Sequence, residues 1–350
     1  MESRKIQTVG GGTYTVSLPK TWAEAHDLEA GSTVDLHTHV DGVLVVEARE
    51  PEAATGPVRV AVDDEPPVHL ERTLRAAYAA GVPAVRFETA DGFSDGQRRR
   101  IEAVTRTLTG VTVAEESTTR ITVRTLLDSG SVSLAQSVRQ LAFVALSMHR
   151  DATAHLGTDG GTDLADRDEQ ADRLAAMVDR HFYRGIDRLD EVDALGQRRP
   201  VLFELWTTAR ELERVADHAD RIARTVAAMD AVDTETAAAL DDLATAARGV
   251  VEDAVPVVID EAGVETTREA LHARDAVRER AGEIESDHFD SETDYRLVRV
   301  LDGIKRTAEH GGNIAETGLR AAIRRGDLAE RITADAGPDG SLDTVADTSG

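Results

Sequence analysis

The second half of the chain contains one short pattern twice, and this repeat constrains the fold more than any other feature. The pattern is Arg-x-Ala-acid-His-x-x-x-Ile-Ala, and its two copies begin at Arg214 and Arg306, 92 positions apart. Both copies lie in a stretch that reads as helical from about residue 133 to residue 326. A repeat of this period predicts two copies of one structural unit.

Five breaks divide the helical stretch, and they set the size of that unit. Glycine, proline and acidic turn residues interrupt the helical periodicity at residues 157–161, 196–200, 230–233, 263 and 286–290. The breaks leave six long helices. We therefore predict two tandem three-helix bundles, over residues 133–230 and 233–326.

The repeated helices carry acidic side chains at helical spacing. Positions i, i+4 and i+7 of a helix share one face, and hard cations prefer oxygen ligands. The predicted metal ligands are Asp168, Asp172, Glu213 and Asp217 in the first copy, and Asp275, Glu279, Glu309, Asn313 and Glu316 in the second. The alternative is a solvated acidic face, which is common in a chain with 65 acidic residues.

The helical half resembles PhoU proteins, whose typical motif reads Glu-Arg-x-x-Asp-His-x-x-Asn-Ile-Ala-Glu. The resemblance covers about residues 133–326. It implies that divalent or iron-type metal ions, often as clusters, bind on the acidic helix faces. It also implies a role in restraining phosphate uptake, together with a phosphate ABC transporter ATPase and a sensor kinase.

Both copies depart from the family motif. Arg221 and Arg224 replace the Asn and the final Glu in the first copy, and Lys305 replaces the first Glu in the second. A cation at a ligand position opposes metal binding, so the first copy is the better candidate site. The alternative is that Asp217 and Glu309 pair with nearby arginines instead of a metal.

Residues 1–50 read as β-strands with one short helix. Apolar and polar residues alternate over residues 13–18, Pro19 ends this strand, and residues 20–26 are suited to a two-turn helix. Residues 34–40 and 43–47 flank an Asp-Gly pair, which predicts a β-hairpin.

The same segment resembles the AbrB/SpoVT/MazE family of swapped-hairpin proteins. The match rests on Arg4 and Lys5, on the run from Gly10 to Lys20, and on the Ser-Leu-Pro-Lys-x-Trp sequence that ends at Trp22. It covers about residues 3–49. It implies a homodimer in which two chains interleave into one β-barrel, and it implies DNA binding.

The local charge agrees with DNA contact. Basic residues contact phosphates, and hydroxyl groups add hydrogen bonds. The predicted DNA-binding residues are Arg4, Lys5, Thr13, Tyr14, Ser17 and Lys20. The alternative is an ordinary scatter of surface charge. A module of about fifty residues with few large side chains has a thin core, which favours dimerisation.

Residues 57–128 alternate between strand and helix patterns. Strands are expected at 58–62, 82–87, 111–113 and 120–123, with helices at 70–80 and 94–108. The order βαβαββ predicts a small mixed sheet with helices packed on it. No chemistry follows from these residues. Residues 334–350 lack periodicity and are expected to form a disordered tail.

Composition limits the remaining choices. The formal net charge is -25, and only three of the 40 basic residues are lysines, which resembles proteins of salt-in halophiles such as halophilic archaea. The chain has no cysteine, so disulfides and thiolate chemistry are excluded. The N-terminus lacks an apolar signal core, and no apolar run suits a membrane helix. A cytoplasmic protein without direct membrane insertion is expected.

Other sequence signals do not indicate an enzyme. His37 and His39 share one strand face without a third ligand. Glu269 with His272, and Glu285 with His288, each match half of a di-iron motif, but both pairs fall on one helix. P-loop, Gly-x-Ser-x-Gly and dinucleotide motifs are absent from the sequence.

Together these features predict a multidomain α+β protein: a swapped-hairpin β-barrel module, a small α/β domain and two tandem three-helix bundles. Two functions remain. One is a regulator that binds DNA and senses or relays phosphate status through its helical half. The other is an adaptor that only dimerises through its N-terminal module and docks on the transporter ATPase or the kinase.

Overall fold

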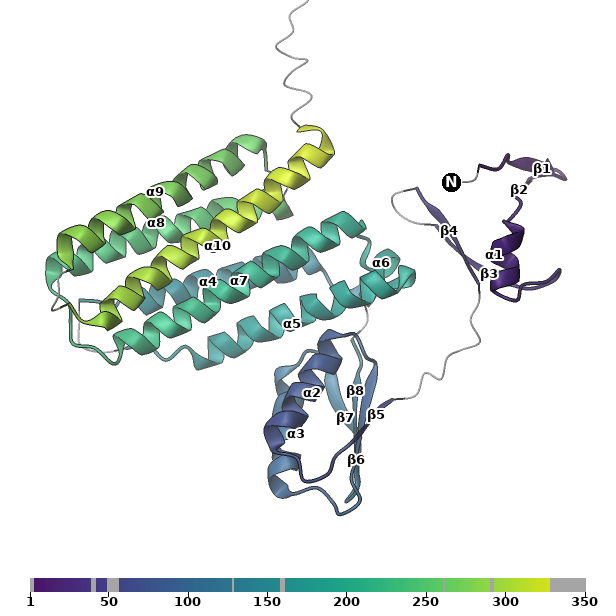
Figure 1. Ribbon diagram of the computed structural model, residues 1–350, viewed down its shortest axis with the longest axis horizontal. Coiled ribbons are helices and arrows are strands. Elements are labelled where there is room, and N and C mark those ends of the chain that lie inside the picture. The colour runs from purple at the N-terminus through teal and green to yellow at the C-terminus, as the bar shows by residue number, and fades with distance from the viewer. Residues whose placement is uncertain are drawn as a thin grey trace, which may run out of the picture. The chain divides into compact units, whose positions relative to one another are not determined.

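The computed structural model describes residues 3–38, 42–48, 57–127, 129–157, 161–260, 262–289 and 293–327 (Figure 1). The chain divides into two compact units, residues 1–56 and 57–350. Each unit is described by itself. The predicted tail, residues 334–350, lies outside the described residues, and so does His39.

The N-terminal unit consists of two antiparallel hairpins and one short helix. Its elements are β1 (Gln7–Val9), β2 (Thr13–Thr15), α1 (Lys20–Ala25), β3 (Val34–Thr38) and β4 (Leu44–Ala48). Strand β1 pairs with β2, and β3 pairs with β4. The second hairpin and the short helix were predicted, whereas β2 ends three residues before the expected Leu18. None of the described residues of this unit is buried.

The next region is an α/β domain with the predicted order of elements. These are β5 (Val58–Ala61), α2 (Pro67–Ala79), β6 (Ala84–Glu88), α3 (Asp95–Thr107), β7 (Val111–Glu116) and β8 (Arg120–Thr125). The strands lie in the order β5-β6-β8-β7, with β5 parallel to β6 and the other neighbours antiparallel. Both helices cover the same face of the sheet (Figure 1).

Local signals account for the boundaries of the two helices in this domain. Ser94 caps α3: its hydroxyl accepts from the Gln97 backbone N–H, while the Gln97 side chain accepts from the Ser94 N–H. Gly81 follows α2 with a positive φ of 81°, a conformation that side chains disfavour. The core between helices and sheet includes Phe87, Leu70 and Ile101.

Seven helices of the described residues form the C-terminal region. They are α4 (Leu134–Thr153), α5 (Ala165–Asp187), α6 (Leu189–Leu195), α7 (Arg199–Val226), α8 (Thr234–Ile259), α9 (Val264–His288) and α10 (Tyr295–Arg325). Six of them are the predicted long helices. The seven-residue α6 was not predicted, because the break at Arg188 has an extended backbone but carries neither glycine nor proline.

These helices form two three-helix groups around one continuous core. Helices α4, α5 and α7 contact one another, and so do α8, α9 and α10. The groups join through contacts of α4 with α8 and of α7 with α10. Glycines let α10 approach α8 closely: a Cβ at Gly311 would lie 2.8 Å from Val250 Cγ1. The predicted multidomain α+β fold, with antiparallel hairpins, a small mixed sheet and a helical half, is therefore confirmed.

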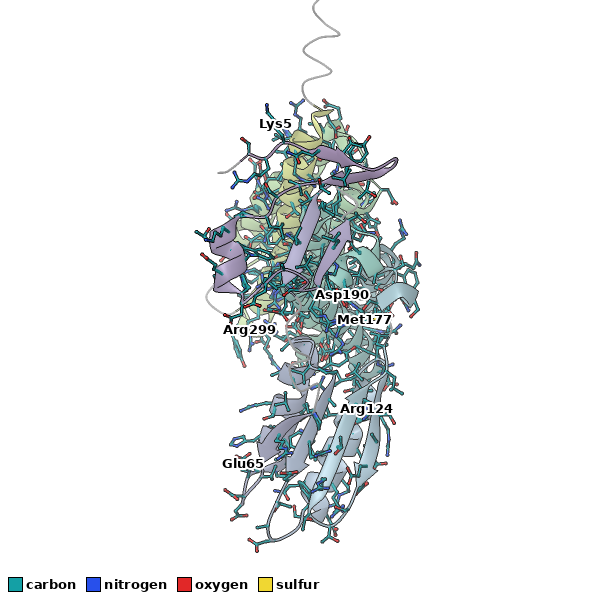
Figure 2. The ribbon with its side chains drawn as sticks, turned by 90° about the vertical axis from the view of Figure 1, so that its right-hand side faces the viewer. Lys5, Glu65, Arg124, Met177, Asp190 and Arg299 are labelled. Atoms are coloured by element: carbon teal, nitrogen blue, oxygen red, sulfur yellow. The ribbon has the colours of Figure 1, made fainter. Side chains whose placement is uncertain are left out.

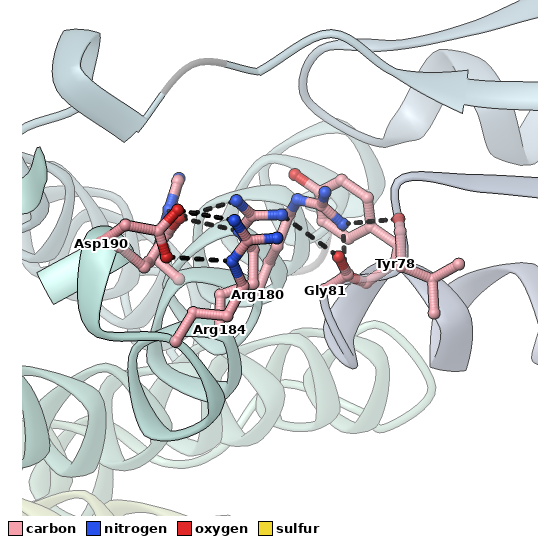
Figure 3. A network of polar contacts seen from close by, with 9 residues as sticks. Tyr78, Gly81, Arg180, Arg184 and Asp190 are labelled. Atoms are coloured by element: carbon pink, nitrogen blue, oxygen red, sulfur yellow. Dashed lines mark hydrogen bonds and ion pairs between the residues drawn. The ribbon is translucent and has the colours of Figure 1, made fainter. Parts of the chain in front are cut away.

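Two arginines of α5, Arg180 and Arg184, attach the α/β domain to this helix (Figure 3). Arg180 is 3% exposed and donates to the backbone oxygens of Tyr78 (3.0 Å) and Val82 (3.1 Å). Its guanidinium also lies over the Tyr78 ring, 5.1 Å from the centroid. Arg184 donates to Gly81 O at 3.4 Å and pairs with Glu191 at 2.8 Å. Hydrogen bonds to the α2–β6 turn thus fix the domain on the helices.

Candidate functional site

The predicted ligands of the first repeat lie on two helices that pack together, α5 and α7. We call Asp168, Asp172, Glu213, Asp217 and Asp220 the α5–α7 acidic face. Asp168 and Asp172 of α5 lie close enough to the carboxylates of α7 for their charges to interact. The structure therefore groups the four predicted ligands of this copy on one surface.

Burial, together with repulsion between carboxylates, raises the pKa of Asp168, Asp172 and Glu213 on this face. Burial, and then the carboxylates of Asp172, Asp220 and Asp217, raise the pKa of Asp168 to about 6. Burial also raises the pKa of Glu213 to about 7, with Asp172, Asp179 and Asp217 adding to the effect and Arg210 opposing it. Carboxylates so close together favour any species that supplies positive charge.

Only part of this charge is compensated by arginines. Asp220 pairs with Arg224 at 2.7 Å, and Asp217 pairs with Arg221 at 3.7 Å. The alternative predicted for Asp217, pairing with an arginine, is thus observed. Asp168, Asp172 and Glu213 make no ion pair with another residue of the described ranges.

The fit of this face to a metal ion is mixed. Its excess negative charge and oxygen donors suit a hard cation. Among the described residues, however, no three His, Asp or Glu side chains converge closely enough to hold one. A cation on this face would therefore have to draw the carboxylates together from their present positions.

The second repeat does not gather its acidic residues in the same way. Arg274 pairs with Asp275 at 2.9 Å and with Glu316 at 3.2 Å, and Glu309 pairs with Arg306 at 3.0 Å. Glu279 is exposed on α9. Because arginines occupy the space between these carboxylates, this face does not fit a cation, and the alternative predicted for Glu309 is observed.

Asn313, the remaining predicted ligand, belongs to a polar network between the repeats that the sequence did not reveal. Its side chain donates to Glu211 Oε2 at 3.0 Å, and His310 Nδ1 lies 2.7 Å from the same oxygen. Burial by itself would raise the pKa of Glu211, but these hydrogen bonds outweigh it and lower the pKa. Glu211 thus remains a buried, hydrogen-bonded carboxylate at the junction of α7 and α10.

The two histidines of the repeated pattern meet at the same junction. The rings of His218 and His310 stack with their centroids 5.2 Å apart. Burial and the neighbouring His310 and Arg221 lower the pKa of His218 to about 4. His149 on α4 is fully buried, and burial and Arg248 lower its pKa to about 3. The rings of His218 and His149 are therefore neutral near pH 7. His218 and His310 occupy the same position in the two copies of the repeat, and this equivalence is the sequence feature that could have predicted their contact.

The predicted DNA-binding residues all lie exposed on the N-terminal unit. The pairing of Gln7 with Thr15 leaves Lys5 and Ser17 just beyond the same end of the first hairpin. Lys20 begins α1 and makes an exposed ion pair with Glu24 at 3.4 Å. The other three residues are Arg4, near Lys5 in the chain, and Thr13 and Tyr14, which begin β2.

The same unit exposes most of its apolar side chains. The exposed fraction is 70% for Ile6, 76% for Tyr14 and 62% for Leu36. Val9, Val16, Leu18, Val43 and Leu44 are also exposed. Two hairpins whose apolar groups face water lack a hydrophobic core of their own. The apolar surface buried within one copy of this unit is therefore too small to explain a stable fold.

Within the described residues, the other histidines noted in the sequence, His37, His272 and His288, do not form a metal site either. His37 lies 3.3 Å from Glu47 on the neighbouring strand. Glu269, His272, Glu285 and His288 all lie on α9, as expected from the sequence. A di-iron centre needs ligands from facing helices, so these half-motifs do not form one.

Comparison with known families matches two separate regions of the chain. Residues 7–54 match a family described as antidote-toxin recognition MazE, bacterial antitoxin. Residues 138–226, which span α4 to α7, match the PhoU domain. No curated protein matches the chain. In the described residues, no helix is both long enough and apolar enough to cross a membrane.

Proposed function

We propose that this chain, in which a MazE/AbrB-like module precedes a PhoU domain, is a DNA-binding transcriptional regulator of phosphate uptake, and not an enzyme. At the level of families, the two matched regions support a regulator of phosphate homeostasis. The observation that carries the proposal is their combination in one chain: one module suited to DNA, the other to phosphate regulation.

The exposed apolar side chains of the N-terminal unit support a homodimer. Fully burying a side chain such as Leu36 contributes about 1.5–3 kcal/mol, so covering several of them in a second copy would stabilise both hairpins. We propose that two chains interleave here into one barrel. The dimer would then present two sets of Arg4, Lys5 and Lys20 to the two halves of a DNA site.

Charge distribution supports the use of this module alone for DNA contact. The chain carries a formal net charge of -25, so most of its surface repels phosphates. Two of its three lysines, Lys5 and Lys20, lie within the first 22 residues. We propose that the helical half instead contacts protein partners in the cytoplasm, a phosphate transporter ATPase and a sensor kinase, and that a divalent or iron-type ion binds the α5–α7 acidic face.

The test is promoter occupancy across the host genome, measured with tagged protein in high and low phosphate. We expect discrete peaks near phosphate-transport genes that change with phosphate. Arg4→Ala combined with Lys20→Ala should remove the peaks. The matched control is Arg99→Ala with Arg278→Ala, which removes two exposed arginines from α3 and α9.

Absence of peaks with the unmodified chain would refute DNA binding and favour the adaptor function. Unchanged peaks in the Arg4 and Lys20 double variant would refute the assigned DNA face. Purified protein and a promoter fragment, titrated at several salt concentrations, would then separate direct from indirect binding, since phosphate contacts weaken with salt.

A further inference from the structure

A small pocket lies between α7 and α10, where the two repeats meet. Its volume is about 130 Å³. It is lined by His218, Arg221, Ile222 and Thr225 from α7 and by Arg299, Asp302 and Gly303 from α10. Pockets for drug-sized ligands occupy about 300–1,000 Å³, so this one is suited to a small ion.

The charged groups of the pocket leave positive charge available. Arg299, labelled in Figure 2, makes no ion pair or hydrogen bond with another residue in the described part of the chain. Within the described residues, the Arg221 guanidinium makes one ion pair, at 3.7 Å with the exposed Asp217. The acidic Asp302 is itself compensated by Lys305 at 3.1 Å and by Arg306 at 3.8 Å. The pocket therefore favours an anion.

His218 lines the same pocket from α7, and its ring stacks on that of His310 with the centroids 5.2 Å apart. Arg221 and Arg299, one from each helix, are therefore the groups that supply positive charge to a bound ion.

The pocket contains a departure from the PhoU motif. Arg221 stands where the typical motif has Asn, and the second copy retains that residue as Asn313. Replacing a neutral amide with a guanidinium disfavours a cation and favours an oxyanion at this position. Helix α7 thus presents carboxylates toward α5 and a guanidinium at the pocket shared with α10.

We propose that this pocket binds inorganic phosphate. Arg221 and Arg299 come from different helices, and a guanidinium fork matches two oxygens of a tetrahedral oxyanion. The Thr225 hydroxyl donates to Arg221 O at 2.7 Å, so its oxygen is free to accept a hydrogen bond. Bound phosphate would bridge the two repeats. Phosphate would then be the signal that the proposed regulator senses, so this inference deepens the proposed function and rests on it.

Asp302 accounts for selectivity among oxyanions. Inorganic phosphate near neutral pH carries at least one proton, which it donates to a carboxylate acceptor. Sulfate has no proton to donate, so the Asp302 carboxylate repels it and receives no hydrogen bond in return. The pocket should therefore prefer phosphate to sulfate, although both ions are tetrahedral and of similar size.

The test is calorimetric titration of the purified full-length chain with potassium phosphate and, separately, with potassium sulfate at constant ionic strength. We expect saturable phosphate binding that Arg299→Ala weakens at least tenfold, and that Arg221→Ala with Arg299→Ala abolishes. Arg278→Ala, which removes an exposed arginine from α9, should leave it unchanged. Asp302→Asn should bring the phosphate and sulfate affinities within a few fold.

The proposal fails if the unmodified chain shows no saturable phosphate binding up to millimolar concentrations, or if the double variant binds as the unmodified chain does. Equal binding of phosphate and sulfate by the unmodified chain would refute the role of phosphate as the ligand. Arg221 and Arg299 are exposed, so circular dichroism should show that both variants stay folded. The titration contains no DNA, so its failure is distinct from a failure of promoter binding.

Discussion

Replacing Glu213 with Gln should stabilise the metal-free protein, because this carboxylate is held in an unfavourable place. Burial and the carboxylates of Asp172, Asp179 and Asp217 raise the pKa of Glu213 to about 7, from an ordinary value of 4.5. The folded chain therefore holds this proton more tightly than the unfolded chain does. Losing the proton lowers the free energy of unfolding.

The two pKa values set the magnitude and the pH range. The difference between the two pKa values corresponds to a loss of stability of about 3 kcal/mol, at about 1.4 kcal/mol for each tenfold change in proton affinity. This loss is absent below pH 4.5, grows as pH rises through 7 and is complete by about pH 8. Glu213 is partly exposed, so screening reduces the expected gain for Glu213→Gln at pH 8 to about 1–2 kcal/mol.

Thermal unfolding followed by circular dichroism at pH 4 and pH 8 measures this gain. In a domain of this size each kcal/mol raises Tm by about 2–4 °C. The matched control is Glu279→Gln, at an exposed carboxylate on α9 that should leave Tm unchanged at both pH values. Equal stability of Glu213→Gln and the unmodified chain at pH 8 would refute the reasoning, as would an equal gain at pH 4.

Three further outcomes are expected. Manganese at millimolar concentration should raise the Tm of the unmodified chain more than that of the Glu213→Gln variant, and an equal rise would count against a metal on the α5–α7 acidic face. Arg180→Ala leaves the oxygens of Tyr78 and Val82 without their donor and should lower the free energy of unfolding by about 2–4 kcal/mol, measured by urea titration. Leu36→Asp should shift the proposed homodimer toward monomer in analytical ultracentrifugation while the helical signal is kept; an unchanged mass would place the dimer contact elsewhere.

The sequence alone determined the order and type of most elements. Helix and strand periodicities, and the turn at Gly42, depend on residues a few positions apart, so they can be read without knowing what packs where. The internal repeat likewise predicted two three-helix groups. Helix α6 escaped prediction because the break at Arg188 arises in a run of ordinary helix-forming residues.

The grouping of charged side chains was decided by tertiary structure. The spacing of acidic residues made both repeats candidate metal sites, and Lys305 made the second the weaker candidate, yet it is Arg274 that neutralises Asp275 and Glu316 there. Asn313 faces Glu211 of the other repeat instead of a metal. Spacing along a helix shows which residues share a face, but the distances between helices and the rotamers of long arginines determine which charges meet there.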